Sequence, residues 1–293
     1  MWRNHHSFVI IRGDLAVETS KLIVINNIAA SKTSSCYFNS GIQTVLVFLI
    51  MNEKKLIIDT FEELSPRYEE VVDAELNLFW GFRYNEFVDT LLKMTTIREQ
   101  DRVLDIATGT GVIPTKISTE NGSVRSLHGL DITFGMLKRA KKKFIEKQVQ
   151  RDIRLACASA MEMPYANHSF DLVFCGLATH HMSVPILLSE MHRVLGNGGR
   201  IAVADVGSSP LWSIPGVKMM LRIGAFIYFY FRENQDRAWA EASAISNIRT
   251  KEEWHALLVE AGFEQISITK LKSKYRWIPD PLVLHAVKNG RRK

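Results

Sequence analysis

Along the middle of the chain, short runs of apolar and β-branched residues alternate with segments in which apolar residues recur every three or four positions. The runs predict strands near 102–107, 126–131, 153–157, 170–175, 199–205, 264–270 and 282–287. The segments between them have helical spacing, as in 134–147, where Thr133 stands at the N-cap position. Strands that alternate with helices form a largely parallel sheet, so the pattern predicts an α/β fold.

Two further regions flank this alternating core. Apolar residues within 53–94 recur at helical spacing and predict two or three helices that cap the core. Late in the chain a capping box, Thr250 to Glu253, predicts a helix that stops at Gly262. We therefore divide the chain into an N-terminal extension (1–50), a helical cap (51–98), a core (99–207), a lid segment (208–248) and a last helix with two strands (249–293).

A glycine turn follows the first strand of the predicted core. The strand Val103–Ile106 runs into Gly109 and Gly111, a helical pattern follows, and the next strand ends on Asp131. Glycines let a ligand approach the backbone, and a carboxylate that ends the second strand can bind the two hydroxyls of a ribose. This order predicts a nucleoside-binding site, although a glycine pair alone also occurs in α/β domains without such a ligand.

Two residues at this turn indicate which class of cofactor it binds. Dinucleotide-binding proteins have a third glycine and hold a pyrophosphate at the helix N-terminus, whereas this chain has Pro114 at that position. Asp105 lies four residues before Gly109, and its negative charge would repel a pyrophosphate but attract a cationic ligand. S-Adenosylmethionine carries a sulfonium and an amino group, so the turn favours this cofactor over a dinucleotide.

Two motifs follow the turn. Residues 159–174 read SAMEMPYANHSFDLVF, and residues 189–200 read SEMHRVLGNGGR. They resemble the A-x-x-L-P-F…S-F-D-L-V and E-x-x-R-V-L-x-P-G-G motifs of class I S-adenosylmethionine-dependent methyltransferases, with Asn197 in place of the usual proline. The resemblance covers roughly residues 100–205. It implies a Rossmann-like sheet of seven strands whose final strand is antiparallel to the rest, with the helical cap and the lid as additions.

The resemblance also implies which residues hold S-adenosyl-L-methionine. Asp105 and the glycine turn would bind its amino acid end, Asp131 the ribose, and Ile132 and Met161 the two faces of the adenine. The cofactor residues that it implies are Tyr68, Asp105, Ala107, Thr108, Gly109, Thr110, Gly111, Asp131, Ile132, Met136, Ser159, Ala160, Met161 and Cys175. For the apolar members the alternative is a place in the core, and for Asp131 it is a helix N-cap.

Two of these residues depart from the family pattern. Ala107 replaces the first glycine of the turn, which we expect to be tolerated if its φ is negative. Ser159 replaces an acidic residue that often contacts the adenine amine, and its hydroxyl would make a weaker hydrogen bond.

The acceptor side of the site is less defined. Residues 61–68, FEELSPRY, resemble the F-x-x-x-A-x-x-Y segment of ubiquinone and menaquinone biosynthesis C-methyltransferases, whose tyrosine covers the cofactor. Residues 71–80 lack the Asn, Ser and His pattern of that group, so quinol carbon, phenolic oxygen and amine nitrogen all stay open. His180 and His181 follow the fourth strand and are the catalytic candidates, since a histidine there could deprotonate the acceptor. The alternative for both is a structural role.

The apolar block Leu211–Phe231 admits two interpretations. Lys218, Arg222 and Pro215 argue against a transmembrane helix. The block is either a lid helix packed on the core, or an apolar lid that covers a lipophilic acceptor or lies in a membrane surface.

Composition narrows the class of protein. The net charge of +6 at pH 7 is modest, and the basic cluster 138–143 has the spacing of a solvated helix face, so we expect no nucleic-acid partner. Cys36, Cys157 and Cys175 are far apart, which predicts a reducing cytoplasm, no disulfide framework and no metal site. Peripheral membrane association and a homodimer both stay open.

The first fifty residues show neither periodicity nor the pattern of a signal peptide. The apolar run Ile42–Met51 is too short to span a bilayer. We expect residues 1–50 to lie outside the working fold, the alternative being a docking segment.

These patterns predict a methyltransferase that acts on a small, lipophilic acceptor, with quinol-like C- or O-methylation as the leading reaction. Two alternatives belong to other classes. One is a dinucleotide-dependent oxidoreductase, against which Pro114 and the motif at 159–174 count. The other is a non-catalytic module that keeps the cofactor pocket.

Overall fold

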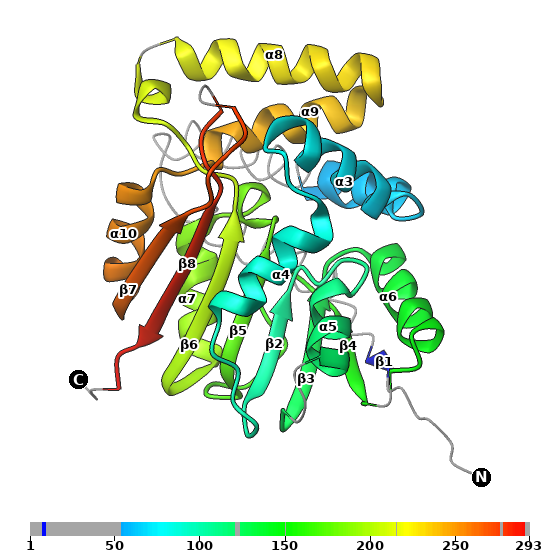
Figure 1. The fold of residues 1–293 in the computed structure, drawn as a ribbon, viewed down its shortest axis with the longest axis vertical. Helices are drawn as coiled ribbons and strands as arrows, with labels where there is room; N and C mark the ends of the chain where they lie inside the picture. Colours follow the sequence, from blue (N-terminus) through cyan, green and yellow to red (C-terminus); the bar gives the residue numbers. More distant parts are fainter. Residues whose placement is uncertain are drawn as a thin grey trace, which may run out of the picture.

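The computed structural model describes residues 8–9, 54–120, 124–149, 151–214, 216–275 and 278–290. They form a central sheet with helices on both faces and a layer of helices over one end (Figure 1). The strand order is β1-β4-β3-β2-β5-β6-β8-β7. The bounds of the strands are β1 Phe8–Val9, β2 Arg102–Ile106, β3 Ser126–Asp131, β4 Ile153–Cys157, β5 Phe170–Gly176, β6 Leu195–Asp205, β7 Phe263–Lys270 and β8 Leu282–Lys288.

All seven predicted strands are present, and the sheet has the expected mixed topology. Strands β2 to β6 pair in parallel, while β8 pairs antiparallel with both β6 and β7. The last strand therefore runs against the others, as predicted. The two-residue strand β1 adds an eighth member by pairing with β4, where Phe8 lies opposite Leu155. Apart from Phe8–Val9, the predicted extension 1–50 and Cys36 lie outside the described residues.

The strands are apolar on both sides because helices cover both faces of the sheet. One face packs against α7 (Val184–Val194) and α10 (Lys251–Glu260). The other packs against α4 (Tyr84–Met94), α5 (Val112–Glu120) and α6 (Phe134–Glu146), with α3 (Tyr68–Phe79) at its rim. Leu104, Leu127 and Leu172 on three neighbouring strands have no exposed surface, so the sheet provides a rigid base for the loops at its end.

Helices of the cap and the lid lie together over the carboxyl ends of the parallel strands (Figure 1). A helix over residues 54–64 and α3 come from the cap. From the lid segment come α8 (Val217–Arg232) and α9 (Gln235–Ala244), with short 3₁₀ turns η2 (Pro210–Ser213) before them and η3 (Ile245–Asn247) after them. The turn η1 (Thr179–His181) follows β5 at the same end. Ligands of open α/β sheets bind at this end of the strands, and the helices enclose it.

The two predicted helix caps lie where the sequence places them, but only one makes its capping hydrogen bonds. Thr250 and Glu253 form the predicted capping box, with N–H···O distances of 3.2 and 2.8 Å. Thr133 is the N-cap residue of α6, as predicted, although its hydroxyl makes no capping hydrogen bond. A carboxylate oxygen of Glu62, from the helix over 54–64, instead accepts a 2.7 Å hydrogen bond from the Gly135 N–H. An acid at a helix N-terminus suits the helix dipole, and here it ties the cap to the core.

The glycine turn contains a strained residue. Ala107 has a φ of +52°, so the negative φ under which we expected alanine to be tolerated is not met. Gly109 and Gly111, at +54° and +76°, share the left-handed region. The turn needs this conformation to lead β2 into α5, and alanine meets it at a steric cost that glycine would not carry.

We expect Ala107→Gly to raise the free energy of unfolding by about 0.5–1 kcal/mol, because the steric cost of a left-handed alanine exceeds the added chain entropy of glycine. Thermal unfolding measures the effect. Ala140→Gly makes the same change inside α6 and should lower stability by about 1 kcal/mol. A loss of stability in both variants would contradict the role assigned to the turn.

Candidate functional site

The site begins with a buried carboxyl at the end of β2. Asp105 has 1% of its surface exposed, and one oxygen accepts a 2.6 Å hydrogen bond from the Thr108 hydroxyl. The other oxygen, Oδ1, has no hydrogen-bond partner among the described residues. Burial raises the pKa of Asp105 to about 8, with a further contribution from the nearby charge of Asp131. A buried acid with an unused oxygen is suited to receive a cationic group.

A second carboxyl, at the end of β3, is held by backbone groups. The two oxygens of Asp131 accept hydrogen bonds of 2.8 Å from the N–H groups of Gly109 and Thr133. Burial raises the pKa of Asp131 to about 6, and these hydrogen bonds oppose the rise. Each oxygen keeps a further lone pair, so the carboxyl can also accept the two hydroxyls of a ribose.

The two glycines of the turn serve different purposes. A Cβ at Gly109 would meet no atom closer than 3.9 Å, so this glycine leaves open space above the backbone, beneath the ring of Tyr68. A Cβ at Gly111 would lie 2.7 Å from the ring of Phe144 and 2.9 Å from Ala140 on α6. Gly109 thus lets a ligand approach the turn, while Gly111 lets α6 pack closely.

Tyr68 and Lys143 connect the cap to this turn. Tyr68, at the start of α3, lies over Gly109, and its contact with the cofactor stays a prediction. Lys143 belongs to the cluster expected to form a solvated face, yet it contacts Glu69 of α3 and lies 3.3 Å from the Thr110 hydroxyl. The solvated-face interpretation is therefore wrong for Lys143, because its long side chain crosses from α6 to the cap.

The residues predicted around adenine are gathered after β3 and β4. Ile132 and Met161 are half-buried, and Ala160 and Met136 are buried. The Ser159 hydroxyl accepts a 3.2 Å hydrogen bond from the Met161 N–H, which shapes this loop. Cys175 has no exposed surface and belongs to the core cluster beneath the site. The contact of these six residues with the cofactor stays a prediction.

Comparisons with known proteins agree with this geometry. A family model described as "Methyltransferase domain" matches residues 104–203. The demethylmenaquinone methyltransferase of Lactobacillus johnsonii is 26% identical over 230 residues, covering 74% of this chain and 88% of the relative. That of Listeria monocytogenes serotype 4a is 28% identical over 193 residues, covering 62% and 77%. The domain match and these relatives support a class I S-adenosylmethionine-dependent methyltransferase. In fold, the chain is similar to the YcgJ protein of Bacillus subtilis, with a TM-score of 0.54 at 18% identity over 70% of this chain and 99% of that one.

The buried groups of the methyltransferase fit its cofactor, S-adenosyl-L-methionine. The unused oxygen of Asp105 would receive the ammonium group, and Asp131 would receive the ribose hydroxyls. When bound, the cofactor supplies an electrophilic methyl group on a positively charged sulfur. The dinucleotide alternative is disfavoured by the family match over residues 104–203.

A histidine and an aspartate form a dyad at the end of β5 and β6. His180 Nδ1 lies 2.7 Å from Asp205 Oδ1, and the His180 N–H donates to Asp205 Oδ2 at 3.1 Å. Asp205 raises the pKa of His180 against the effect of burial, and His180 in turn lowers the pKa of Asp205. Among the described residues, the Nε2 atom of His180 has no hydrogen-bond partner. The dyad therefore holds one ring nitrogen and leaves the other available.

Sequence reasoning missed three charged residues beside the dyad. Arg237 of α9 is buried between Glu75 of α3, at 3.2 Å, and Glu241 of α9, at 3.0 Å. Glu241 also lies 3.6 Å from His181 Nε2. The i,i+4 spacing of Arg237 and Glu241 was the one local signal, and such pairs are usually on solvated helix faces.

The atoms of His180, His181 and Glu241 that could bind a metal lie within 4.8 Å of one another. However, the Arg237 guanidinium already lies 3.0 Å from Glu241, and Asp205 already binds the His180 ring. A second cation beside Arg237 would be repelled, so the cluster is better suited to polar chemistry without a metal.

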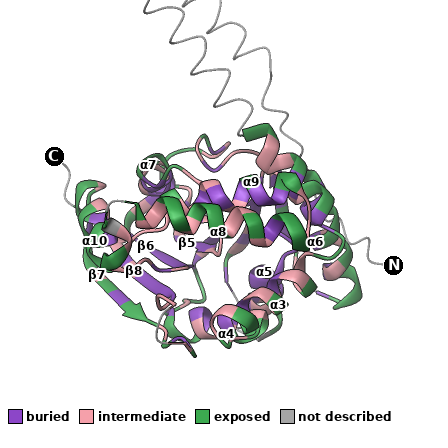
Figure 2. Ribbon diagram, turned by 90° about the horizontal axis from the view of Figure 1, so that it is seen from above, coloured by how far each residue is buried: buried purple, intermediate pink, exposed green. Residues whose placement is uncertain are grey.

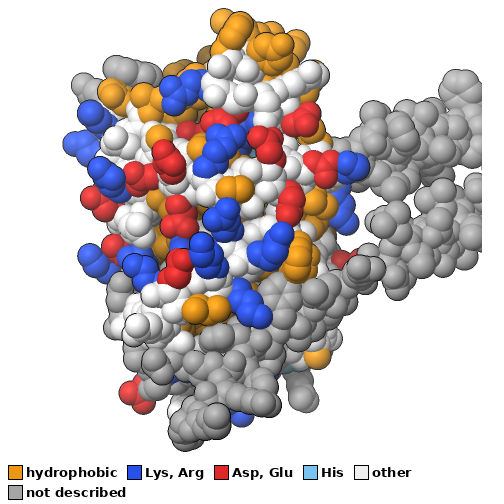
Figure 3. All heavy atoms as spheres, turned by 90° about the vertical axis from the view of Figure 1, so that its right-hand side faces the viewer, with side chains coloured by type: hydrophobic (Ala, Val, Ile, Leu, Met, Phe, Trp, Pro, Cys, Tyr) orange, Lys and Arg blue, Asp and Glu red, His pale blue; other side chains and the backbone are white. Residues whose placement is uncertain are grey.

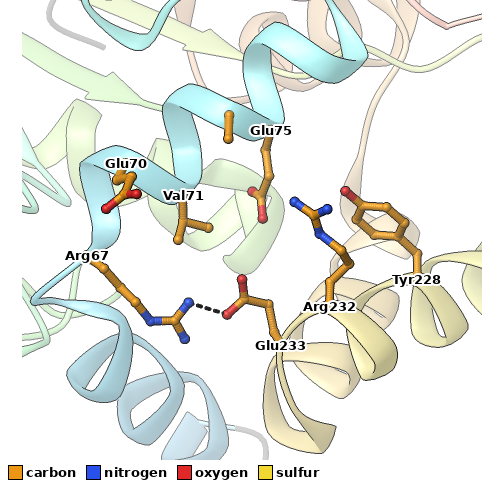
Figure 4. A pocket seen from close by; sticks show the side chains of 8 residues that line it. Arg67, Glu70, Val71, Glu75, Tyr228, Arg232 and Glu233 are labelled. Atoms are coloured by element: carbon orange, nitrogen blue, oxygen red, sulfur yellow. Dashed lines mark ion pairs between the residues drawn. The ribbon is translucent and has the colours of Figure 1, made fainter.

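A cavity of about 220 Å³ opens between α3 and α8. Figure 4 shows Glu75 directed into it from α3, opposite Tyr228 and Arg232 of α8, with the Arg67–Glu233 ion pair across its lower side. Because Glu75 also binds Arg237, this cavity ends beside the buried polar cluster.

We expect cofactor binding to release a proton from Asp105. With a pKa of about 8 the free carboxyl is mostly protonated at pH 7, and a bound ammonium group favours the carboxylate. Calorimetry of S-adenosylmethionine binding in phosphate and in Tris should therefore show proton release at pH 7 that becomes smaller as the pH rises above 8.

Asp105→Asn should abolish this release, while the exposed Asp152→Asn should keep it. Equal binding enthalpies in the two buffers at pH 7 would show that Asp105 does not ionise on binding.

Proposed function

We propose that the enzyme methylates a quinol-like, lipophilic acceptor on carbon or oxygen, with His180 as general base. The single observation that carries this proposal is the His180–Asp205 dyad, which holds His180 Nδ1 and leaves the other ring nitrogen of His180 available. The names of the relatives from Lactobacillus and Listeria support a quinone-type acceptor.

Aromatic side chains lie close to His181, the neighbour of the dyad residue His180. The ring of Phe61 lies 5.1 Å from His181 and 6.4 Å from Tyr68. Phe229, the one buried residue of α8, contacts Arg237. Flat apolar rings bind another flat ring well, and the few polar groups among them fix its orientation.

The polar groups supply the chemistry that such an acceptor needs. Asp205 holds the His180 ring so that Nε2 can accept a proton from the acceptor hydroxyl. The electron pair released passes to the adjacent ring carbon, or stays on the oxygen, and forms the new bond to the methyl carbon as the bond to sulfur breaks. For carbon methylation, the hydrogen on that carbon then leaves as a proton and the ring becomes aromatic again.

The direct test supplies the enzyme with labelled S-adenosylmethionine and 2-prenyl-1,4-dihydroxynaphthalene, kept reduced without oxygen. We expect the label in the ring carbon or the hydroxyl of the product, which mass spectrometry distinguishes. If the enzyme binds the cofactor but transfers no methyl group to this acceptor, or to phenols and amines in a lipid extract, the proposal is wrong. The protein would then be a non-catalytic module that binds the cofactor.

The role of His180 has its own signature. His180→Ala should lower kcat by about 10²–10⁴ and Asp205→Asn by about 10–100, with the cofactor affinity unchanged. His255→Ala, an exposed histidine on α10, is the control.

Because Asp205 raises the pKa of His180, and the base must be neutral, activity should rise with pH through a limb above the ordinary histidine value. Asp205→Asn should move this limb to lower pH. A limb at the same pH in both enzymes would contradict the dyad.

We further propose that α8 lies in a membrane surface that contains the acceptor. Its exposed apolar residues recur at three- and four-residue steps on the side opposite Phe229, and they are Met219, Met220, Ile223, Ile227, Tyr230 and Phe231. Figure 2 shows α8 exposed above α9, and Figure 3 shows hydrophobic side chains gathered at this end, above a face where acids and bases are mixed.

The charges of α8 favour lipid over a second copy of the chain. Lys218, Arg222 and Arg232 are its charged residues, and all are basic, which suits anionic headgroups but repels an identical helix. No helix in the described part of the chain is long and apolar enough to cross a bilayer, so contact through α8 would be peripheral.

Flotation with phosphatidylglycerol vesicles tests this contact. The enzyme should float with the vesicles, less so at high salt, and Met220→Asp with Phe231→Asp should weaken binding at least tenfold because two exposed apolar side chains no longer enter the lipid. Ile145→Asp, an exposed apolar residue on α6, should bind like the unchanged enzyme. A dimer in sedimentation with no vesicle binding would assign the face to a second copy instead.

A further inference from the structure

Arg237 is the most deeply buried arginine beside the site, and it is only half-satisfied. Its side chain is 5% exposed, and the Nη2 atom makes both of its ion pairs, with Glu75 and Glu241. The other two nitrogens, Nε and Nη1, have no hydrogen-bond partner among the described residues. Three N–H bonds of a buried guanidinium are therefore unused.

A second unused polar atom lies in the same cluster. The side chain of His181 is only 8% exposed, and its Nδ1 atom has no hydrogen-bond partner among the described residues. His181 and Arg237 share one oxygen of Glu241, at 3.6 and 3.0 Å, so the two residues are neighbours. Native proteins seldom leave buried polar groups unpaired, because each costs free energy, unless a water or a ligand completes them.

We propose that Arg237 binds an oxygen atom of the acceptor through Nε and Nη1, and that His181 Nδ1 contacts the same oxygen. This inference rests on the proposed function, and it adds the residue that fixes which way the acceptor ring faces. His180 then serves the hydroxyl next to the methylated carbon, while Arg237 serves the second ring oxygen.

The charges around Arg237 define the kind of oxygen. Glu241 is held ionised by Arg237, and Glu75, whose pKa burial raises to about 7, is partly ionised at neutral pH. Together they offset the positive charge of the guanidinium. A carboxylate or phosphate would add a further negative charge to a buried cluster that has no net positive charge to receive it. A hydroxyl or carbonyl oxygen of a neutral ring accepts the same hydrogen bonds without this penalty.

Two aromatic rings lie beside the guanidinium that would bind this oxygen. The guanidinium carbon lies 5.4 Å from the ring centre of Phe61 and 5.5 Å from that of Phe229. Phe61 belongs to the cap and Phe229 to α8, so an acceptor bound to Arg237 would contact both layers. The two rings exclude water, which strengthens each hydrogen bond beside them.

The test compares two acceptors that differ by one oxygen. Both 2-prenyl-1,4-dihydroxynaphthalene and 3-prenyl-1-naphthol keep the hydroxyl beside the carbon to be methylated, but the second lacks the other hydroxyl. Arg237→Lys keeps the positive charge between Glu75 and Glu241 and removes the Nε and Nη1 donors. The unchanged enzyme should have a KM for the diol at least tenfold lower than for the naphthol. In Arg237→Lys the two values should approach each other.

A structural role for Arg237 predicts a different result. Loss of folding stability would lower kcat for both acceptors alike and leave their KM ratio as it was, which would overturn the inference. The Kd of S-adenosylhomocysteine, measured by calorimetry, should stay the same in Arg237→Lys. Arg249→Met is the control, because it removes a guanidinium that makes an exposed hydrogen bond to the Ser246 carbonyl.

If Arg237→Lys does not fold, His181→Asn provides the second arm, since it replaces the ring that carries the other unused polar atom, Nδ1, and should reduce the same KM ratio. If the unchanged enzyme methylates neither compound, the proposed function fails. Equilibrium binding of the two compounds to the S-adenosylhomocysteine complex then still tests Arg237, and equal affinities would overturn its role.

Discussion

The buried carboxyl of Asp131 connects the parts on which the site depends. Its two oxygens receive N–H groups from Gly109 in the turn after β2 and from Thr133 at the start of α6. The turn after β2, 22 residues before Asp131, and the start of α6 are thereby fixed to one side chain on β3. The backbone hydrogen bonds offset the free energy cost of burying the acid. They also hold the carboxyl in place for the ribose that we expect it to bind.

The sequence was a good guide to whatever depends on neighbouring residues. Each core strand was predicted within a residue or two, except that β6 starts four residues early, at Leu195, through an irregular pairing with Phe170. Period-two runs, turn glycines and the Thr250 capping box are local signals, and folding preserved them. The one local rule that failed is at Ala107, where the turn imposes a left-handed conformation on a residue that disfavours it.

The acceptor side was predicted less well because its contacts are distant in the sequence. Asp205 was taken as the end of a strand, yet it binds His180, 25 residues away. Arg237 and Glu75 are 162 residues apart, and neither belongs to a motif. Glu62 reaches α6 over 73 residues and takes the capping role expected of Thr133. Such pairs arise from the way the cap and the lid meet over the sheet, which no periodicity reports.

The ion pair between Arg237 and Glu75 has a kinetic consequence. It joins α9 of the lid to α3 of the cap, so separating the two layers requires that the buried guanidinium of Arg237 lose its partner Glu75. A methylated product that is bound beneath Phe61 and Phe229, as proposed above, would leave only after that separation. The slowest event of a turnover would then be the parting of two helices rather than the breaking of a carbon–sulfur bond, and a viscous solvent would slow the enzyme more than a heavy isotope in the methyl group.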